Sequence, residues 1–357
     1  MTGTAQQQAY EIPQRMLVLR DFCTRTHGSS CTRCAQTCAH NALSFAENQP
    51  PIINGNACTL CGACQGTCDA FSPTTNTLAE LHAQARKAAL GNRPCIITCT
   101  ENVKDNHHEL ASNVVVAPCL AALPAEAWCA LLTEGSTVEV SLDLARCETC
   151  ARAGACAEEL YSTAIARAEQ WAERSIGFRE NLPYAKDEGL LAGLANAGAD
   201  GDRRALFTDM LAQLKDAASG ALRERTDEHL QTLREQNQRL AAHQRLHLGT
   251  GTQFNKFAPL GRTRQVMGLS RKLLLQAIDS DPSVATRAQL PFPLTNNQCE
   301  NCLACTKVCP TGARLPSAKD GTLVFDWRYC IGCGLCESAC PNHAVALTNE
   351  FIADMAC

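Results

Sequence analysis

Apolar residues follow two different periods in the first half of this chain. Three short apolar runs have the length of buried strands, and each leads toward a cysteine: residues 94–99, 113–119 and 136–144. Helix-forming stretches separate these runs, notably 124–133, and a further helix is expected at 156–175, where it would back the sheet. Alternation of short apolar strands with helices predicts a small parallel sheet.

Smaller elements are predicted ahead of this sheet. Residues 16–20 form a short strand-like run, and 43–45 would pair with 52–53 as a hairpin. Residues 78–90 are good helix formers with an apolar stripe, and Gly91 would cap this helix at its C-terminal end.

The pattern changes in the second half of the chain. Residues 182–202 are rich in glycine and lack periodicity, which indicates a linker, and a proline-bearing linker is expected at 281–293. Helices are predicted at residues 203–218, 223–247 and 263–278. The second of these helices is strongly polar with a narrow apolar stripe. Residues 203–247 are therefore expected either to dock against another subunit or to brace the rest of the chain.

The composition limits the classes of function. With 357 residues the chain has room for two or three domains. A net charge of −4 and an aromatic content of 5% leave no basic stripe or stacking platform, so no nucleic acid is expected as a partner. The first ten residues lack the features of a signal peptide, and no run approaches the roughly 18 apolar residues of a membrane span. No direct membrane insertion is expected.

Cysteine is the residue that points to a chemistry. The chain has 24 cysteines, clustered at short spacings, which favours metal thiolates in a reducing compartment over secreted disulfides. The cytoplasm is the expected location. Residues 299–341 contain the pattern C-x2-C-x2-C-x3-C-P twice. Three thiolates on a tight loop can bind three irons of a [4Fe–4S] cube, and the fourth cysteine of each motif reaches the other cube.

This cross-over rule defines two ligand sets in the C-terminal region. They are Cys299, Cys302, Cys305 with Cys340, and Cys330, Cys333, Cys336 with Cys309. The region 291–347 resembles the bacterial dicluster ferredoxin. The doubled spacing does not favour zinc or a disulfide framework.

The N-terminal region repeats this pattern. By the same rule its ligand sets are Cys23, Cys31, Cys34 with Cys68, and Cys58, Cys61, Cys64 with Cys38. The repeat departs from the pattern at two points. Seven residues separate Cys23 from Cys31, and Ala39 and Asp69 stand where proline is expected. The longer loop leaves open that His27 replaces Cys23 or that this site holds three irons.

The middle region adds a third group of cysteines. Ligands collect at the carboxyl ends of parallel strands, where Cys99, Cys119, Cys147 and Cys150 could converge, with Cys156 as a spare candidate. Cys95 and Cys129 are interpreted as small buried side chains. The strand–cysteine run, VAPCLAALP and RCETCARAGAC together resemble the iron–sulfur δ-subunit domain of hydrogenases and heterodisulfide reductases, over about residues 94–182.

Several chemistries remain open for this middle group. It could hold a [2Fe–2S] or a fifth [4Fe–4S] cluster. Zinc could be bound by Cys147, Cys150, Cys156 and one more ligand. Alternatively, Cys147 and Cys150 could form a thioredoxin-like dithiol between a strand and a helix, or the cysteines could be inert.

The predicted fold class is α+β and multidomain. Two ferredoxin-like dicluster modules, at 1–77 and 291–357, flank a cysteine-rich α/β domain with a parallel sheet at 78–182 and a linker with helices at 183–290.

The expected function is electron transfer. The chain has no dinucleotide fingerprint, no P-loop and no arrangement for a serine or histidine nucleophile. It resembles polyferredoxin subunits that serve molybdopterin enzymes such as formate dehydrogenase, or hydrogenases. That resemblance implies four or more clusters and a catalytic oxidoreductase subunit as partner. The alternatives are a thiol–disulfide reductase that uses the middle cysteines and a zinc-stabilised scaffold.

Overall fold

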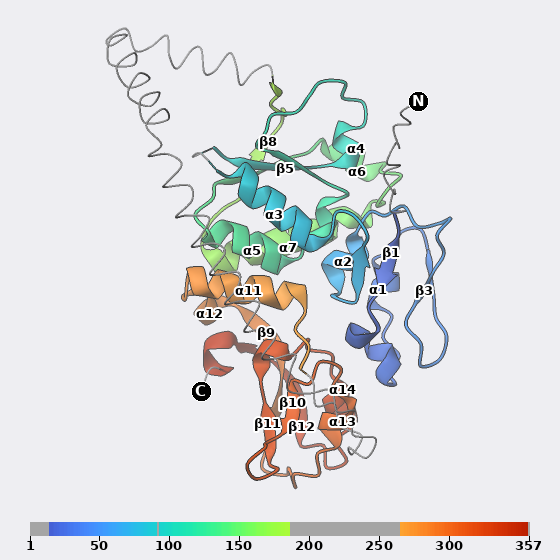
Figure 1. Ribbon diagram of the computed structural model, residues 1–357, viewed down its shortest axis with the longest axis vertical. Helices are drawn as coiled ribbons and strands as arrows, with labels where there is room; N and C mark the ends of the chain where they lie inside the picture. The colour runs from blue at the N-terminus through green and yellow to red at the C-terminus, as the bar shows by residue number, and fades with distance from the viewer. Residues whose placement is uncertain (1–13, 91–92, 186–264, 356–357) are drawn as a thin grey trace, which may run out of the picture. The chain divides into compact units, whose positions relative to one another are not determined.

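The computed structural model describes residues 14–90, 93–185 and 265–355. All of them fall into one unit, which spans Met1–Ala185 and Leu260–Cys357. The fold is mixed α/β (Figure 1). The helices expected at 203–218 and 223–247, and most of the linker expected at 182–202, lie outside the described residues. Within the described ranges, none of the helices has the length and apolar character needed to cross a membrane.

A four-stranded parallel sheet forms the middle of the fold, in the order β6-β5-β7-β8. Its strands are β5 (Cys95–Cys99), β6 (Val114–Ala117), β7 (Val138–Ser141) and β8 (Gly177–Arg179). Every residue of β5 is buried, as expected for a strand covered on both faces. The first three strands confirm the predicted sheet. The edge strand β8 was not predicted, because it is only three residues long and mostly exposed.

The third strand is shorter than expected. It ends at Ser141, and the short helix α6 (Leu144–Glu148) follows it. The Asp143 side chain accepts a hydrogen bond from the Ala145 N–H and so caps this helix. Cys147 therefore lies in a helix, and the strand does not run on to it.

Helices cover the sheet in the positions that the pattern predicts. α3 (Leu78–Ala88) packs on β5 and β6, and begins with a capping box between Thr77 and Glu80. α5 (Ala125–Thr133) packs on α3, on α7 (Cys156–Ala172) and on α11 (Leu269–Ser280).

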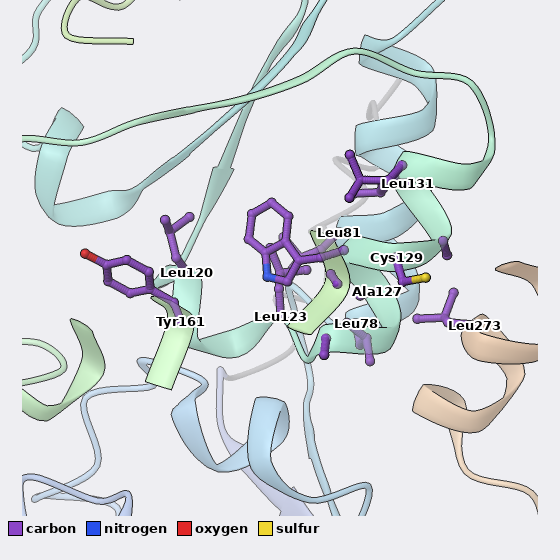
Figure 2. Close-up of a cluster of buried hydrophobic side chains, with 14 of the residues drawn as sticks. Leu78, Leu81, Leu120, Leu123, Ala127, Cys129, Leu131, Tyr161 and Leu273 are labelled. Atoms are coloured by element: carbon purple, nitrogen blue, oxygen red, sulfur yellow. The ribbon is translucent and has the colours of Figure 1, made fainter. Parts of the chain in front are cut away.

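The core lies between these helices and the sheet. Figure 2 shows Leu81 of α3, Leu131 of α5 and Leu273 of α11 in this buried cluster. Trp128 of α5 is fully buried within the same cluster. The core therefore joins the residues that precede the undescribed segment to those that follow it.

The two terminal regions share one topology, and each has two short antiparallel pairs of strands. In the N-terminal region, β1 (Met16–Val18) pairs with β4 (Phe71–Pro73), and β2 (Leu43–Ser44) with β3 (Ile52–Ile53). In the C-terminal region, β9 (Gln289–Thr295) pairs with β12 (Val345–Phe351), and β10 (Arg314–Pro316) with β11 (Leu323–Phe325).

Short helices occupy matching places in the two regions. They are α1 (Arg33–Gln36) and α2 (Ala63–Thr67) in the first, and α13 (Ala304–Val308) and α14 (Leu335–Ser338) in the second. Each carries the third cysteine of its motif. The sequence repeat is therefore also a repeat of structure. Further short helices are η1 (Arg20–Phe22), η2 (Thr24–His27), α4 (Thr100–Val103), η3 (Leu120–Ala122), α12 (Val284–Arg287), η4 (Trp327–Tyr329) and η5 (Ile352–Met355).

The prediction of a linker at 281–293 is wrong for most of these residues. α12 and the strand β9 occupy this stretch, and β9 pairs along all seven residues with β12. Pro291 and Pro293 are tolerated because β9 belongs to a two-stranded sheet and has an open edge. The helix expected from residue 263 begins at Leu269 in the described part, with Gly268 as its N-cap.

Ala39 and Asp69, which stand where the ferredoxin pattern has proline, are contact points with the rest of the chain. Asp69 Oδ1 accepts hydrogen bonds from the Ser270 backbone N–H (3.0 Å) and from its hydroxyl (2.8 Å). Ala39 lies so close to Gly154 that a Cβ on that glycine would stand 2.6 Å from the Ala39 Cβ. Proline at position 69 would have no side-chain oxygen to accept the two hydrogen bonds from Ser270.

Candidate metal centres

Five groups of four cysteines are the candidate sites, numbered here along the chain. Site 1 is Cys23, Cys31, Cys34 and Cys68; site 2 is Cys38, Cys58, Cys61 and Cys64; site 3 is Cys99, Cys119, Cys147 and Cys150; site 4 is Cys309, Cys330, Cys333 and Cys336; site 5 is Cys299, Cys302, Cys305 and Cys340.

Site 1 brings together cysteines from both N-terminal motifs. Burial raises the pKa of Cys34 to about 11, and the charges of Cys68, Cys31 and Cys23 contribute to the shift. All four line one cavity, and His27 is not among the residues around it. The segment that links Cys23 to Cys31 forms the short helix η2, which ends at Gly28 with a φ of 86°. This turn takes up the longer loop and leaves Cys23 beside its partners.

Site 2 has the reciprocal arrangement. Burial, followed by the charges of Cys61, Cys58 and Cys38, raises the pKa of Cys64. The four cysteines line a cavity of about 30 Å³. The Ala42 backbone N–H donates to Cys38 Sγ at 3.4 Å.

Site 3 lies at the carboxyl ends of three parallel strands. Cys99 ends β5, Cys119 follows β6, and Cys147 and Cys150 lie in and just after α6. All four line a cavity of about 20 Å³. Burial raises the pKa of Cys119 to about 12, with contributions from the charges of Cys61, Cys99 and Cys150. The Tyr161 hydroxyl of α7 lies 3.9 Å from Cys147 Sγ.

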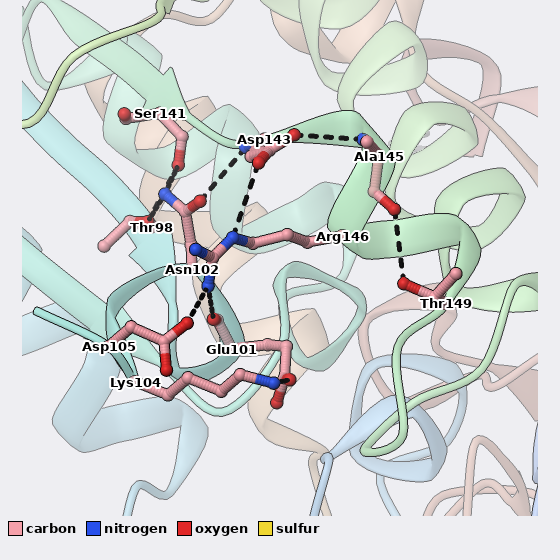
Figure 3. Close-up of polar contacts among 10 residues, drawn as sticks. All are labelled: Thr98, Glu101, Asn102, Lys104, Asp105, Ser141, Asp143, Ala145, Arg146 and Thr149. Atoms are coloured by element: carbon pink, nitrogen blue, oxygen red, sulfur yellow. Dashed lines mark hydrogen bonds and ion pairs between the residues drawn. The ribbon is translucent and has the colours of Figure 1, made fainter.

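A polar network fixes the two sides of site 3 relative to each other (Figure 3). Asn102 Nδ2 donates to Thr98 Oγ1 (3.0 Å) and to the Ser141 carbonyl (3.2 Å). Its Oδ1 accepts from the Asp143 N–H at 3.1 Å. Arg146, next to Cys147, pairs with Asp105 at 2.8 Å. These bonds connect α4, which follows Cys99, to α6, which carries Cys147.

Site 4 is the more enclosed of the two C-terminal sites. Its four cysteines line a cavity of about 20 Å³. Burial raises the pKa of Cys330 to about 11, while the Gly332 N–H, 3.4 Å from its Sγ, and Arg271 oppose the shift. Gly332 has a φ of 62°, and a Cβ there would lie 2.5 Å from Pro291 Cγ. Glycine is required where the loop passes this close to β9.

Site 5 is more open. Cys305 is buried, and Cys340 packs against the small apolar cluster that contains Cys305 and Val345. The Ala344 N–H donates to Cys340 Sγ at 3.2 Å. Cys302 is exposed and Cys299 half-buried. The same cluster also contains Cys336 of site 4, so Cys340 lies beside cysteines of both C-terminal motifs.

The remaining cysteines take other places. Cys95 and Cys129 are fully buried in the core, as predicted. Cys156 is exposed, and it does not line the cavity of site 3, which disfavours a zinc site built from Cys147, Cys150 and Cys156. Burial raises the pKa of Cys147, whereas a reactive dithiol needs a lowered one. Cys357 lies outside the described residues.

The donor sets fit iron–sulfur cubes. Within the described ranges, no group of three or more histidine, cysteine or acidic side chains is arranged to hold one metal ion. The four thiolates of a cube bind four different irons, so they stand farther apart than four ligands of one ion. All-thiol donor sets, N–H groups that point at sulfur and glycines at close approaches fit this requirement.

The sites lie in a row. α2, which carries Cys64 of site 2, packs on η3, the helix after Cys119 of site 3. Sites 1 and 2 share one apolar cluster. Site 1 and Cys330 and Cys333 of site 4 line the same cavity of about 500 Å³. Cys305 of site 5 and Cys336 of site 4 belong to one small apolar cluster. The order is 3, 2, 1, 4, 5.

Sequence reasoning missed the side chains that surround the sulfurs. Arg314, Tyr161 and Asn102 touch or position cysteines, yet none belongs to a motif. For Arg314 a signal existed: alignment of the two repeats places an arginine where the N-terminal repeat has Leu43.

Comparison with known proteins supports the chemistry of the C-terminal region. Residues 298–345 match the model of the 4Fe–4S dicluster domain, so this part of the chain is such a domain, as its spacing predicts. This match supports the binding of [4Fe–4S] clusters within residues 298–345.

Three relatives illustrate the similarity. The chain is 53% identical over 48 residues to a component of the anaerobic dimethyl sulfoxide reductase of Escherichia coli, covering 13% of this chain and 22% of that one. It is 42% identical over 74 residues to a component of the selenate reductase of Mesobacillus selenatarsenatis, covering 21% and 24%. It is 38% identical over 71 residues to the thiosulfate reductase electron transfer subunit of Salmonella typhi, covering 19% and 36%.

The chain thus spans between about a fifth and about a third of the length of these curated relatives. No solved structure matches the chain significantly.

Proposed function

We propose that this chain is a non-catalytic electron-transfer subunit of a larger oxidoreductase, and that it relays single electrons through sites 1 to 5. The observation that carries this proposal is the continuity of the row. Each site has a neighbour with which it shares a cavity, an apolar cluster or a contact between the helices beside them. A row of closely spaced thiolate sites suits conduction, and the protein's part is to set spacing, exclusion of water and local charge.

Sites 1, 2, 4 and 5 are each proposed to hold one [4Fe–4S] cluster, and site 3 a fifth iron–sulfur cluster. When bound, these clusters supply one-electron steps. The chain's residues hold the sulfurs and direct N–H groups at them, such as those of Ala42, Gly332 and Ala344. Apolar packing around Cys34, Cys305 and the core-facing side of site 3 keeps water away.

The proposed partner is a catalytic subunit of the molybdopterin type. The relatives are named as components of dimethyl sulfoxide, selenate and thiosulfate reductases, which favours such a reductase over a hydrogenase. The abundance of free thiols supports a reducing compartment, and we propose the cytoplasm.

The two ends of the row are the proposed points of exchange with partners. Site 5 exposes Cys302, and site 3 is edged by the charged residues Asp143 and Arg146, which are partly open to solvent. Sites 1, 2 and 4 lie between these ends and serve as relays.

Iron and sulfide counting on protein purified without oxygen tests the proposal. Four cubes and a fifth cluster require about 18–20 irons per chain, and four cubes alone about 16. A saturated preparation with about eight irons would overturn the N-terminal sites. Cys150→Ala separates the relay from a dithiol enzyme, because a relay loses the iron of site 3, whereas a dithiol enzyme keeps all its iron and loses turnover.

A further inference from the structure

Arg314 is a buried cation between the two C-terminal sites. It is the first residue of β10, and only 2% of it is exposed. Its Nη1 donates toward Cys305 Sγ of site 5 at 3.7 Å. Its Nη2 donates to the Pro293 carbonyl (2.6 Å) and to Thr295 Oγ1 (2.9 Å), which hold it against β9. The guanidinium lies 5.6 Å from the centre of the Phe325 ring.

Among the described residues, no carboxylate balances the charge of Arg314. No ion pair in the described ranges includes Arg314, and its Nε has no hydrogen-bond partner. A guanidinium is always charged, and an uncompensated buried charge is strongly unfavourable. Arg314 also reaches the second site, because it lines the cavity of about 20 Å³ that the four cysteines of site 4 surround. Two sets of thiolates are therefore the counter-charge that this arginine faces.

The N-terminal repeat provides an internal comparison. Cys309 to Arg314 aligns with Cys38 to Leu43, and Ala313 and Ala42 are both buried. Sites 1 and 2 thus have an apolar residue at the place of the arginine. Arg33 acts on Cys68 of site 1, but its side chain is exposed, so solvent screens its charge.

We propose that Arg314 raises the reduction potentials of both site 4 and site 5. Electrons in the row are then held preferentially at its C-terminal end. This inference rests on the proposed function. Reduction adds one electron to a site and removes none of its ligands, so a fixed positive charge nearby stabilises the reduced form. The hydrogen bond to Cys305 Sγ acts in the same direction, because potentials depend on net charge and on hydrogen bonds to sulfur.

The test is a redox titration of the full-length protein, reduced stepwise with dithionite and followed by EPR. Iron content is measured first. In Arg314→Gln, both C-terminal sites should become at least tenfold harder to reduce, which is about 59 mV for a one-electron couple. A unit charge acting over about 8 Å at an effective dielectric constant near 20 suffices for this change. The potentials of the N-terminal sites should stay unchanged.

Matched variants separate charge from packing. Arg314→Lys keeps the charge and should retain most of the potential. Arg328→Gln removes an exposed arginine of the same domain, which pairs with Asp326 at 2.6 Å, and should change nothing. Thr295→Asp places a carboxylate beside Arg314 at an exposed position and should lower both potentials. This last variant decides the question if Arg314→Gln does not bind its clusters.

The outcomes are distinguishable. Wild-type protein that lacks iron in sites 4 and 5 would contradict the proposed function itself. Suppose instead that Arg314→Gln or Thr295→Asp has its full iron content and that its potentials lie less than about 59 mV below those of the wild type. This result would overturn the role of Arg314 and leave the proposed function intact. A drop at only one site would overturn the claim that this arginine serves both.

Discussion

Gly66 lies where the N-terminal sites meet the middle domain, and its substitution gives a sharp test of that contact. It belongs to α2, which carries Cys64 and packs on η3, the helix that follows Cys119. A Cβ on Gly66 would lie 2.0 Å from the Ala121 carbonyl oxygen and 3.1 Å from its carbon. The neighbouring Gln65 side chain donates to the Ala122 carbonyl at 3.3 Å, so the contact is already close.

Two opposing effects decide the result of Gly66→Ala. Alanine is favoured over glycine inside a helix by about 1 kcal/mol. The added methyl group, however, meets a backbone carbonyl, which cannot rotate away as a side chain would, and overpacking of this kind costs about 1–3 kcal/mol. Because the gap is far below a van der Waals contact, the upper part of that range is expected. We predict a net loss of about 1–2 kcal/mol in the free energy of unfolding.

Thermal unfolding without oxygen measures this loss, and Gly55→Ala is the matched control. Gly55 lies in the same region, is exposed, and would place its Cβ more than 4 Å from any atom. Gly66→Ala should melt a few degrees below the wild type, whereas Gly55→Ala should not. EPR of the reduced protein should also show weaker magnetic interaction between sites 2 and 3. Equal melting of the two variants, with unchanged interaction, would refute the close packing of α2 on η3.

Other contacts lead to three more expected outcomes. Cys340→Ala should disturb the EPR signal of site 5 and leave that of site 4, and the reverse result would contradict the cross-over of ligands. Asn102→Leu removes three hydrogen bonds and leaves the Asp143 N–H without its acceptor, at about 1–3 kcal/mol, and should lose the iron of site 3 first; unchanged iron content would exclude its positioning role. Burial, helped by the Arg86 charge, lowers the pKa of His82 from 6.5 to about 4, so the folded protein keeps this histidine neutral. The free energy of unfolding should therefore decrease as the pH drops from 6.5 to about 4. Denaturant titrations should show a weaker pH dependence in His82→Gln.

The sequence alone determined the elements that local chemistry controls. Cysteine spacing identified the sites, because three thiolates on one loop must match the geometry of one cluster. Apolar runs such as β5 and helices such as α5 followed from hydrophobic period, since burial on one or both faces leaves a regular pattern. The repeat was visible for the same reason, and the 4Fe–4S dicluster domain at 298–345 agrees with it.

Tertiary structure decided what depends on contacts between distant segments. The prolines of β9 predict a linker, because the strand that pairs with it, β12, lies some fifty residues later and leaves no local signal. Asp69 departs from the motif, and the sequence gives no reason for it, because its hydrogen-bond partner Ser270 lies 201 residues later. The order of the sites and the position of Arg314 between two of them have no local signature, because charge and proximity act through space and leave no period in the sequence.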